Sequence, residues 1–451
     1  MSESPDHSPA HGQSGTPDRA LARWLVPALI TLVVGVSLAA SHRLGGDMPG
    51  VHLRVHALRE GDFVRLPQWF GGAPNLTYSL LLTPLGLVLG VPLLAGLSAA
   101  STVAGVCWLG RHVDSRWRAT LLTVSAITSA LATLAVGRVT YSTGTAFGIW
   151  AVVALLPLAD ERRRPGRLVG AMTLAVLAGA ASPVAGMFLA MVAVGHLVPA
   201  RRLLRTVAVA GAALTPPVAI NLAYASDGGL ALSAGAGLAI AALYLAVLLA
   251  SRSRSVRATA LLGILATAAV TVVDTQVTYI VKRLPETFGA PALAATGRRA
   301  VSTILIGVLV GWNLLSLRTG LSESGQGERS GAAFAPLVET LRSLDAEGTV
   351  EVVPTALHWE TWFVAREFPI ARGWERQSDA DHGPIFYDGT PLDADEYADW
   401  LRAEQVRWVA LPRLEIDHAG RAEAELLADP PPYLRQVSDD GLWTVWAVEL
   451  P

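Results

Sequence analysis

Residues 46–78 read GDMPGVHLRVHALREGDFVRLPQWFGGAPNLTY and form a polar stretch between hydrophobic segments. The stretch is too long for a tight turn, and it is crowded with acids, histidines, arginines and aromatic residues. It directly follows the first hydrophobic segment, 24–40. Loops held by a rigid scaffold are a common place for binding and catalytic residues. We therefore take this loop as the candidate reactive face and the flanking helices as its support.

The composition indicates a polytopic membrane protein. Of the 451 residues, 52% are hydrophobic and 16% are charged, and the mean hydropathy is +0.42. This apolar excess is well above that of a soluble chain. Residues 1–320 hold 25 Lys and Arg against 12 Asp and Glu, whereas residues 321–451 hold 10 against 25. We expect a basic membrane part followed by an acidic, water-soluble domain, which argues against nucleic-acid binding.

Composition shifts divide the chain into four parts. The Ser- and Pro-rich residues 1–23 predict a disordered tail, and the apolar segment after them predicts an uncleaved first span rather than a signal peptide. Residues 24–320 form a transmembrane domain with an extracytoplasmic loop at 41–75. A polar linker at 321–331 leads to a soluble domain at 332–451.

The hydrophobic runs predict about 10–11 helical spans. After the loop, we expect a helix lying at the outer interface at 76–89, followed by a true span at 93–110. The later spans are expected at 119–136, 141–158, 168–181, 184–198, 204–222, 230–250, 257–273 and 301–317. A short apolar piece at 288–295 is a candidate for a further, incomplete span.

The soluble part alternates helix-like and strand-like patterns. Helices are expected at 334–344 and 394–403, and strands at 350–353, 406–411 and 442–448. A chain of about 120 residues is a normal size for one domain. The predicted fold is therefore an α-helical polytopic membrane domain with a small C-terminal α/β domain.

Basic loops orient the chain in the plasma membrane. Four of them, at 111–118, 162–167, 201–205 and 252–257, are expected on the cytoplasmic side together with the N-terminus. The first loop and the loop at Asp227 then lie outside. The side of the C-terminal domain depends on the segment 288–295. If this segment crosses the membrane, the domain is extracytoplasmic, and if it does not, the domain is cytoplasmic.

Asp47 is the first acid after the membrane and the candidate catalytic base. A group transfer from a lipid phosphate needs a carboxylate to deprotonate the acceptor hydroxyl and cations to hold the departing phosphate. The candidates for donor binding in the loop are His52, Arg54, His56 and Arg59, which fall at helical spacing. The alternative is a solvated amphipathic helix whose arginines contact lipid headgroups.

Two more clusters lie at the outer ends of spans. Arg138 and Tyr141 stand between two of them, and an arginine at membrane depth is costly unless it is paired or used. Lys282 and Arg283 are adjacent cations near Asp274, and they suit a phosphate or pyrophosphate. We assign all four to donor binding. The alternatives are snorkelling to the surface for Arg138 and an interfacial anchor for the lysine and its neighbour.

Aromatic residues beside charged ones suggest an acceptor site. The candidates are Trp69, His358, Trp359, Glu360, Trp374 and Glu375. Aromatic faces bind sugars, but interfacial tryptophans and a packed domain explain the same residues.

Known cofactor motifs are missing from the sequence. We find no Walker loop, no dinucleotide fingerprint, no zinc-ligand spacing and no nucleophile elbow. Cys107 is the only cysteine, which excludes an intrachain disulfide and a cysteine metal cluster. No cofactor is therefore assigned. A divalent metal at the phosphate is compatible with the chemistry, and its ligands are unknown.

The order of features resembles a known superfold. The pattern GD, then H…ALREG…LPQWFGGAP and an apolar interfacial helix, resembles the polytopic GT-C glycosyltransferases, above all large actinobacterial integral membrane proteins with a C-terminal soluble domain. Similar segments are GRVTY at 137–141, ASPVAG at 181–186, VEVVPTALHWETWF at 350–363, ARGWERQ at 371–377, IFYDG at 385–389, YADWLRAEQVRWVALP at 397–412 and PYLRQV at 432–437.

The resemblance implies a function. The donor would be a polyprenyl-phosphate sugar, and the acceptor a cell-envelope glycan or lipid outside the membrane, with transfer of a hexosyl or pentosyl group. The loop aspartate of these enzymes maps onto Asp47. The resemblance also implies that the segment 288–295 crosses, so that the C-terminal domain is extracytoplasmic.

Two other functions are compatible with the sequence. A transporter or flippase would carry internal repeats and ionisable groups near the midplane, whereas we detect no repeat and the ionisable residues gather at the outer face. A non-catalytic envelope scaffold would use the C-terminal domain as a binding module. A lateral cavity beneath Asp47 would favour transfer, and a midplane site would favour transport.

Overall fold

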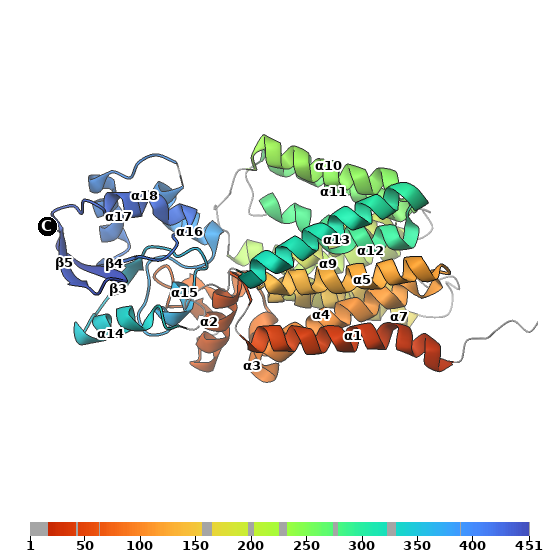
Figure 1. Cartoon of the computed structure of the whole chain (residues 1–451), viewed down its shortest axis with the longest axis horizontal. Helices are drawn as coiled ribbons and strands as arrows, with labels where there is room; N and C mark the ends of the chain where they lie inside the picture. The colour runs from red at the N-terminus through yellow and green to blue at the C-terminus, as the bar shows by residue number, and fades with distance from the viewer. Residues whose placement is uncertain are drawn as a thin grey trace, which may run out of the picture.

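The computed structural model describes residues 17–41, 44–62, 64–155, 165–196, 203–224, 232–273, 278–322, 331–387 and 389–450. A bundle of long helices and a smaller domain with a β-sheet lie end to end, and the first loop lies between them (Figure 1). The predicted fold class, a helical membrane part with a small C-terminal α/β domain, is confirmed.

The bundle contains the predicted spans. Its helices are α1 (Pro17–Ala40), α4 (Val91–Leu109), α5 (Arg116–Ala135), α6 (Val139–Leu155), α7 (Pro165–Ala181), α8 (Pro183–Gly195), α9 (Leu203–Ala223), α10 (Ala234–Ala250), α11 (Arg254–Val272), α12 (Arg283–Thr296) and α13 (Arg299–Ser322). Among the described residues, six helices, α1, α4, α5, α9, α11 and α13, are long and apolar enough to cross a membrane, and four shorter ones are apolar. The chain is a multi-pass membrane protein.

Large apolar side chains on the outside of the bundle support this conclusion. Leu204, Leu222 and Ile304 are 85%, 81% and 69% exposed. Apolar side chains exposed on several helices need lipid around them, because water would disfavour so large an apolar surface.

One expectation at the N-terminus was wrong. We predicted disorder over 1–23, but α1 begins at Pro17. Proline suits the first turn of a helix, and the residues after it, DRALAR, are mostly good helix formers. Residues 1–16 lie outside the described part of the chain, as do Asp227 and Asp274.

The first loop folds into short elements. It contains α2 (Met48–Arg59), β1 (Arg65–Leu66), β2 (Ala73–Pro74), the 3-10 turn η1 (Asn75–Thr77) and α3 (Leu82–Leu89). The helix expected at 76–89 is therefore shorter than predicted. Its start is replaced by a turn in which Ser79 Oγ accepts a hydrogen bond from the Leu82 N–H at 2.9 Å. Gly90, at φ +78°, separates α3 from α4.

The short helix α12 runs between the two ends of the bundle. It starts at Arg283 beside the first loop, and at its far end Gly297 forms a bridge with Ser251. Helix α13 then returns, and Gly320 packs against Ala135 near the loop. The C-terminal domain therefore lies at the same end of the bundle as the first loop (Figure 1). This arrangement is the one expected if the segment 288–295 crosses the membrane, and the extracytoplasmic side of the domain stays a prediction.

The C-terminal domain contains a four-stranded sheet. Its order is β3 (Thr349–Val352), β4 (Val406–Pro412), β6 (Trp443–Val448) and β5 (Leu434–Asp439). Strands β3 and β4 are parallel and the other pairs antiparallel. The helices are α14 (Ala335–Ser343), α15 (Glu360–Phe363), α16 (Arg376–His382), α17 (Ala394–Ala403) and α18 (Arg421–Leu426).

Helices α14 and α17 and strands β3, β4 and β6 were predicted, whereas the short helices α15, α16 and α18 were not. Strand β5 was also missed. Its sequence, LRQVSD, is polar, and only its first residue is buried. An edge strand with few buried side chains gives a weak alternating pattern.

The first loop extends the sheet of the C-terminal domain. Trp69 forms a parallel bridge with Ile370, which in turn bridges Val350 in β3. The Ile370 N–H donates to the Gln68 carbonyl at 3.0 Å. This pairing covers a sheet edge and fixes the domain on the loop.

Candidate functional site

Two turns pack against each other at the outer end of the bundle. The Gly45 N–H donates to the Ala135 carbonyl at 2.7 Å. Gly137 has φ +88°, and a Cβ there would lie 2.8 Å from the Gly45 oxygen and 2.9 Å from the Met48 nitrogen. Only glycine fits this contact. The turn that carries Arg138 is therefore held directly against the turn that carries Asp47.

The carboxylate of Asp47 makes no hydrogen bond or close ion pair with the described residues. Asp47 occupies the N-cap position of α2, yet its side chain makes no capping hydrogen bond, although aspartate is a favoured capping residue. Within the described chain, its carboxylate has no basic partner within 4 Å. The oxygens of this half-buried carboxylate are therefore available to a further hydrogen-bonding group.

Two arginines lie near this carboxylate. The guanidinium of Arg283, at the start of α12, interacts electrostatically with Arg138 and with Asp47. Neither arginine has an acidic group within 4 Å among the described residues, and Nε of Arg138 is buried without a hydrogen-bond partner. Two like charges held close together destabilise each other unless an anion joins them. The arrangement suits a phosphate.

Tyr141 connects the helices around these arginines. Its side chain is 2% exposed, and its hydroxyl donates to Thr287 Oγ1 at 3.3 Å. The guanidinium of Arg283 lies 5.9 Å from the Tyr141 ring centroid. The Tyr141 ring meets Phe188 of α8 edge-on at 6.1 Å. Tyr141 therefore positions the start of α12.

Lys282 stands beside a residue that the sequence analysis missed. Its Nζ lies 3.9 Å from Oε1 of Glu286, and Glu286 is only 9% exposed. The backbone carbonyl of Glu286 accepts a hydrogen bond from Asn313 Nδ2 at 3.0 Å. An acid four residues after a lysine, within an apolar segment, was the signal that could have identified it.

Tyr78 is a second residue that was missed, because we interpreted it only as the start of an interfacial helix. Burial and the negative charge of Asp47 raise the pKa of Tyr78 to about 12. The guanidinium of Arg54 lies 4.7 Å from the Tyr78 ring centroid, and Trp374 meets the ring edge-on at 5.5 Å. Tyr78 thus connects Asp47, Arg138 and Arg283, which we call the Asp47 region, with the C-terminal domain.

The basic residues of the first loop do not all lie near Asp47. The imidazole rings of His52 and His56 both lie 5.6 Å from the ring of Trp362, so they face the C-terminal domain. Arg59 is exposed at the end of α2. Arg54 is 1% exposed, and its Nη2 donates to Glu375 Oε2 at 3.0 Å.

The acceptor candidates divide into two groups. Trp69, Trp359 and Glu360 are 0%, 1% and 2% exposed, and the Trp69 indole donates to the Thr361 carbonyl at 3.2 Å. Trp69 and Trp359 lie in the interface between the loop and the domain, whereas Glu360 accepts a hydrogen bond from Thr355 Oγ1 at 2.6 Å within the domain. Trp374 and Glu375 are half-buried and lie at the edge of the Asp47 region.

His358 holds a strained turn in the C-terminal domain. Its φ is +56°, a region that residues with a Cβ rarely adopt. Nδ1 lies 3.3 Å from Glu360 Oε1, and Nε2 lies 3.7 Å from Asp417 Oδ2. Burial lowers the pKa of His358, but its pairing with Asp417 and Glu360 outweighs burial and raises this pKa to about 9.

This pairing predicts a pH-dependent effect of His358→Gln. The charged imidazole contributes its full stabilisation below the ordinary histidine pKa of about 6.5, and this is lost as the pH rises through about 9. We expect the variant to lower the melting temperature at pH 6 much more than at pH 10. Thermal unfolding at both pH values checks this, with His112→Gln as a control. Equal effects at the two pH values would contradict the assignment.

No metal centre is assigned. Over the ranges that the structure describes, no group of three or more His, Cys, Asp or Glu side chains is arranged to hold a metal ion. The cation that interacts electrostatically with Asp47 in the described chain is Arg283, and Arg138 lies close to Arg283.

Among the solved structures that are similar to this chain are two crystal structures of ArnT from Cupriavidus metallidurans. The structure bound to undecaprenyl phosphate is 14% identical, with a TM-score of 0.47, and the match covers 94% of this chain and 98% of that chain. The structure in the apo state is 14% identical, with a TM-score of 0.46, and covers 93% and 98%. No protein-family model and no curated protein matches the chain.

Proposed function

We propose that the chain is a membrane glycosyltransferase that moves a sugar from a polyprenyl-phosphate donor to an extracytoplasmic cell-envelope acceptor. The observation that carries this proposal is the free carboxylate of Asp47 beside two arginines without acidic partners. A base next to an anion site, at the end of a membrane bundle, is what transfer from a lipid phosphate requires.

The proposed reaction uses these groups in one displacement. Asp47 accepts the proton of the acceptor hydroxyl as the acceptor oxygen forms a bond to the anomeric carbon. The bond from that carbon to the phosphate oxygen breaks, and the polyprenyl phosphate leaves with its electron pair. Arg138 and Arg283 stabilise the charge that grows on the phosphate, since fixed cations are most effective where charge develops. Lys282 assists from the adjacent position.

The proposed orientation follows from charge. The loops at the end of the bundle away from Asp47 contain many arginines, so this end is cytoplasmic under the positive-inside rule. The Asp47 region and the C-terminal domain are then extracytoplasmic. Trp374 and Glu375, which lie at the edge of this region, are the best-placed acceptor contacts.

The described ionisable residues do not favour a transporter. Asp47, Arg138 and Arg283 gather at one end of the bundle, whereas transporters bind their substrate near the midplane. A non-catalytic scaffold would give no transfer with any donor, and the experiments below detect that outcome.

The first test is donor binding by two arginine variants. We expect Arg138→Gln and Arg283→Gln each to weaken binding of a labelled polyprenyl phosphate by about 10- to 100-fold, because charge-assisted hydrogen bonds contribute about 1.5–3 kcal/mol. Scintillation proximity binding in detergent measures the effect. Arg413→Gln, which breaks an exposed pair with Asp439, is the control. Unchanged binding in both variants would refute the phosphate site.

A further inference from the structure

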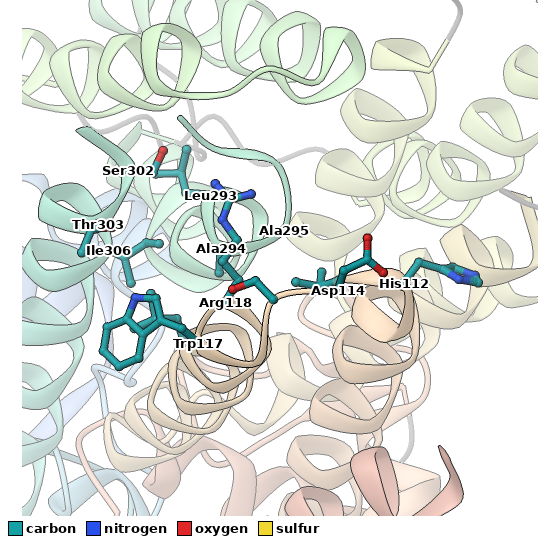
Figure 2. Close-up of a pocket in the computed structure, with 13 residues that line it drawn as sticks. His112, Asp114, Trp117, Arg118, Leu293, Ala294, Ala295, Ser302, Thr303 and Ile306 are labelled. Carbon is teal, nitrogen blue, oxygen red and sulfur yellow. The ribbon is translucent and has the colours of Figure 1, made fainter. Parts of the chain in front are cut away.

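A cavity lies at the end of the bundle away from Asp47. It has a volume of about 570 Å³ and is formed by the start of α5, the end of α12 and the start of α13 (Figure 2). Because it is separated from the Asp47 region by the length of the bundle, it has no part in the proposed transfer reaction. The inference below does not depend on that reaction.

The cavity has a polar side. Arg118 is half-buried, and one of its N–H groups donates to the Gly297 carbonyl, which leaves its other donors without a hydrogen bond in the described chain. In Figure 2, Arg118 points across the cavity toward Leu293 and Ala294 of α12. His112 and Asp114 lie on the same polar side, away from Trp117 and Ile306. The cavity wall therefore contains the Arg118 guanidinium, which has N–H groups available to a ligand.

The other side of the cavity is apolar. It is formed by Trp117, Leu121, Leu293 and Ile306, and the Trp117 ring lies beside Ile306 in Figure 2. Trp117 is 62% exposed. Tryptophans of this kind mark the level of lipid headgroups. On α13 the neighbouring Ile304 is 69% exposed, which continues the apolar surface outward to the acyl chains.

The loops around the cavity are strongly basic. The segments 110–118, 250–257 and 297–302 contain eight arginines and a single acid, Asp114. Segments 250–257 and 297–302 are in contact, because the Arg252 N–H donates to the Thr296 carbonyl and the Arg298 N–H to the Ala250 carbonyl. The positive electrostatic potential of these arginines attracts anions and concentrates them at the membrane surface.

We propose that this cavity binds the headgroup of an anionic phospholipid from the adjoining leaflet. The phosphate lies against Arg118, and the acyl chains follow the apolar side past Trp117 and Ile306. Basic pockets between membrane helices on the cytoplasmic side are known to hold anionic headgroups. The bound lipid would contact α5, α12 and α13 at the end of the bundle opposite the first loop and hold them together.

The test uses the full-length protein in detergent and short-chain lipids of defined headgroup. We expect dioctanoyl phosphatidylglycerol to raise the melting temperature, dioctanoyl phosphatidylcholine to raise it much less, and inorganic phosphate at the same concentration to have no effect. Arg118→Gln should weaken the apparent affinity for phosphatidylglycerol by about tenfold or more. Arg413→Gln, which changes an exposed arginine in the C-terminal domain, should leave it unchanged.

A second variant keeps the test informative if Arg118→Gln does not fold. Asp114→Asn removes the exposed acid from the wall and should strengthen phosphatidylglycerol binding. Equal stabilisation by the two lipids would overturn the proposal, since it would show only an apolar groove. Stabilisation by inorganic phosphate alone would assign the cavity to a free anion. Unchanged affinity for phosphatidylglycerol in both Arg118→Gln and Asp114→Asn would also overturn the proposal.

Discussion

The Asp47→Asn variant is expected to lose sugar transfer almost completely while remaining folded. A general base contributes about 10²- to 10⁴-fold to a rate, and asparagine cannot accept the acceptor proton. Because the Asp47 side chain makes no capping hydrogen bond, its replacement by an isosteric amide should not destabilise α2. The measurement is transfer in membranes from cells that express either form, with a panel of labelled polyprenyl-phosphate sugars.

The matched control for this experiment is Glu60→Gln. Glu60 is an exposed acid at the other end of α2, about 20 Å from Asp47 at 1.5 Å per residue. The Glu60→Gln variant should leave transfer unchanged. Equal transfer by wild type and Asp47→Asn would remove Asp47 as the base and direct attention to Glu60 or Asp62. If the wild type transfers no sugar from any donor, the scaffold and transporter hypotheses are better supported than the glycosyltransferase hypothesis.

The Arg54→Met variant is expected to release the C-terminal domain from the first loop. Arg54 is 1% exposed, and its guanidinium lies 5.1 Å from the Trp69 ring centroid and 3.0 Å from the Glu375 carboxylate. Removing one partner of a buried ion pair costs about 3–5 kcal/mol, because the other charge is left uncompensated. Limited proteolysis and thermal unfolding should both detect the loosened interface.

Two further variants separate docking from a general loss of stability. Arg342→Met breaks the exposed pair with Glu367, which should cost only about 0–1 kcal/mol. The double variant Arg54→Met/Glu375→Met should recover much of the lost stability, since it removes both buried charges. A double variant no more stable than Arg54→Met would show that Glu375 is not the partner that matters.

Loosening this interface should also lower transfer. Arg54 and Trp374 both contact Tyr78, and Tyr78 interacts electrostatically with Asp47. If Arg54 bound the donor directly, as the sequence analysis expected, the double variant would remain inactive even after its stability had recovered. The two roles of Arg54 are therefore distinguishable.

The sequence by itself determined the membrane architecture. A long apolar run can bury its backbone polar groups only as a helix in lipid, so the bounds of α5, α9 and α13 follow closely from composition. It also determined the α/β character of the C-terminal domain, because helical and alternating patterns are local. The same reasoning identified Asp47, the first acid after the first span, as the candidate base.

Only the tertiary structure decided which residues share a site. Gly137 permits the turn of Arg138 to touch the turn of Asp47, and Arg283 at the start of α12 interacts electrostatically with both residues. Neither relation leaves a periodic pattern in the sequence. The partner of Arg54 lies 321 residues further along the chain. Charge and spacing alone could not tell a donor contact from a docking residue, because that difference depends on which distant segment covers the side chain.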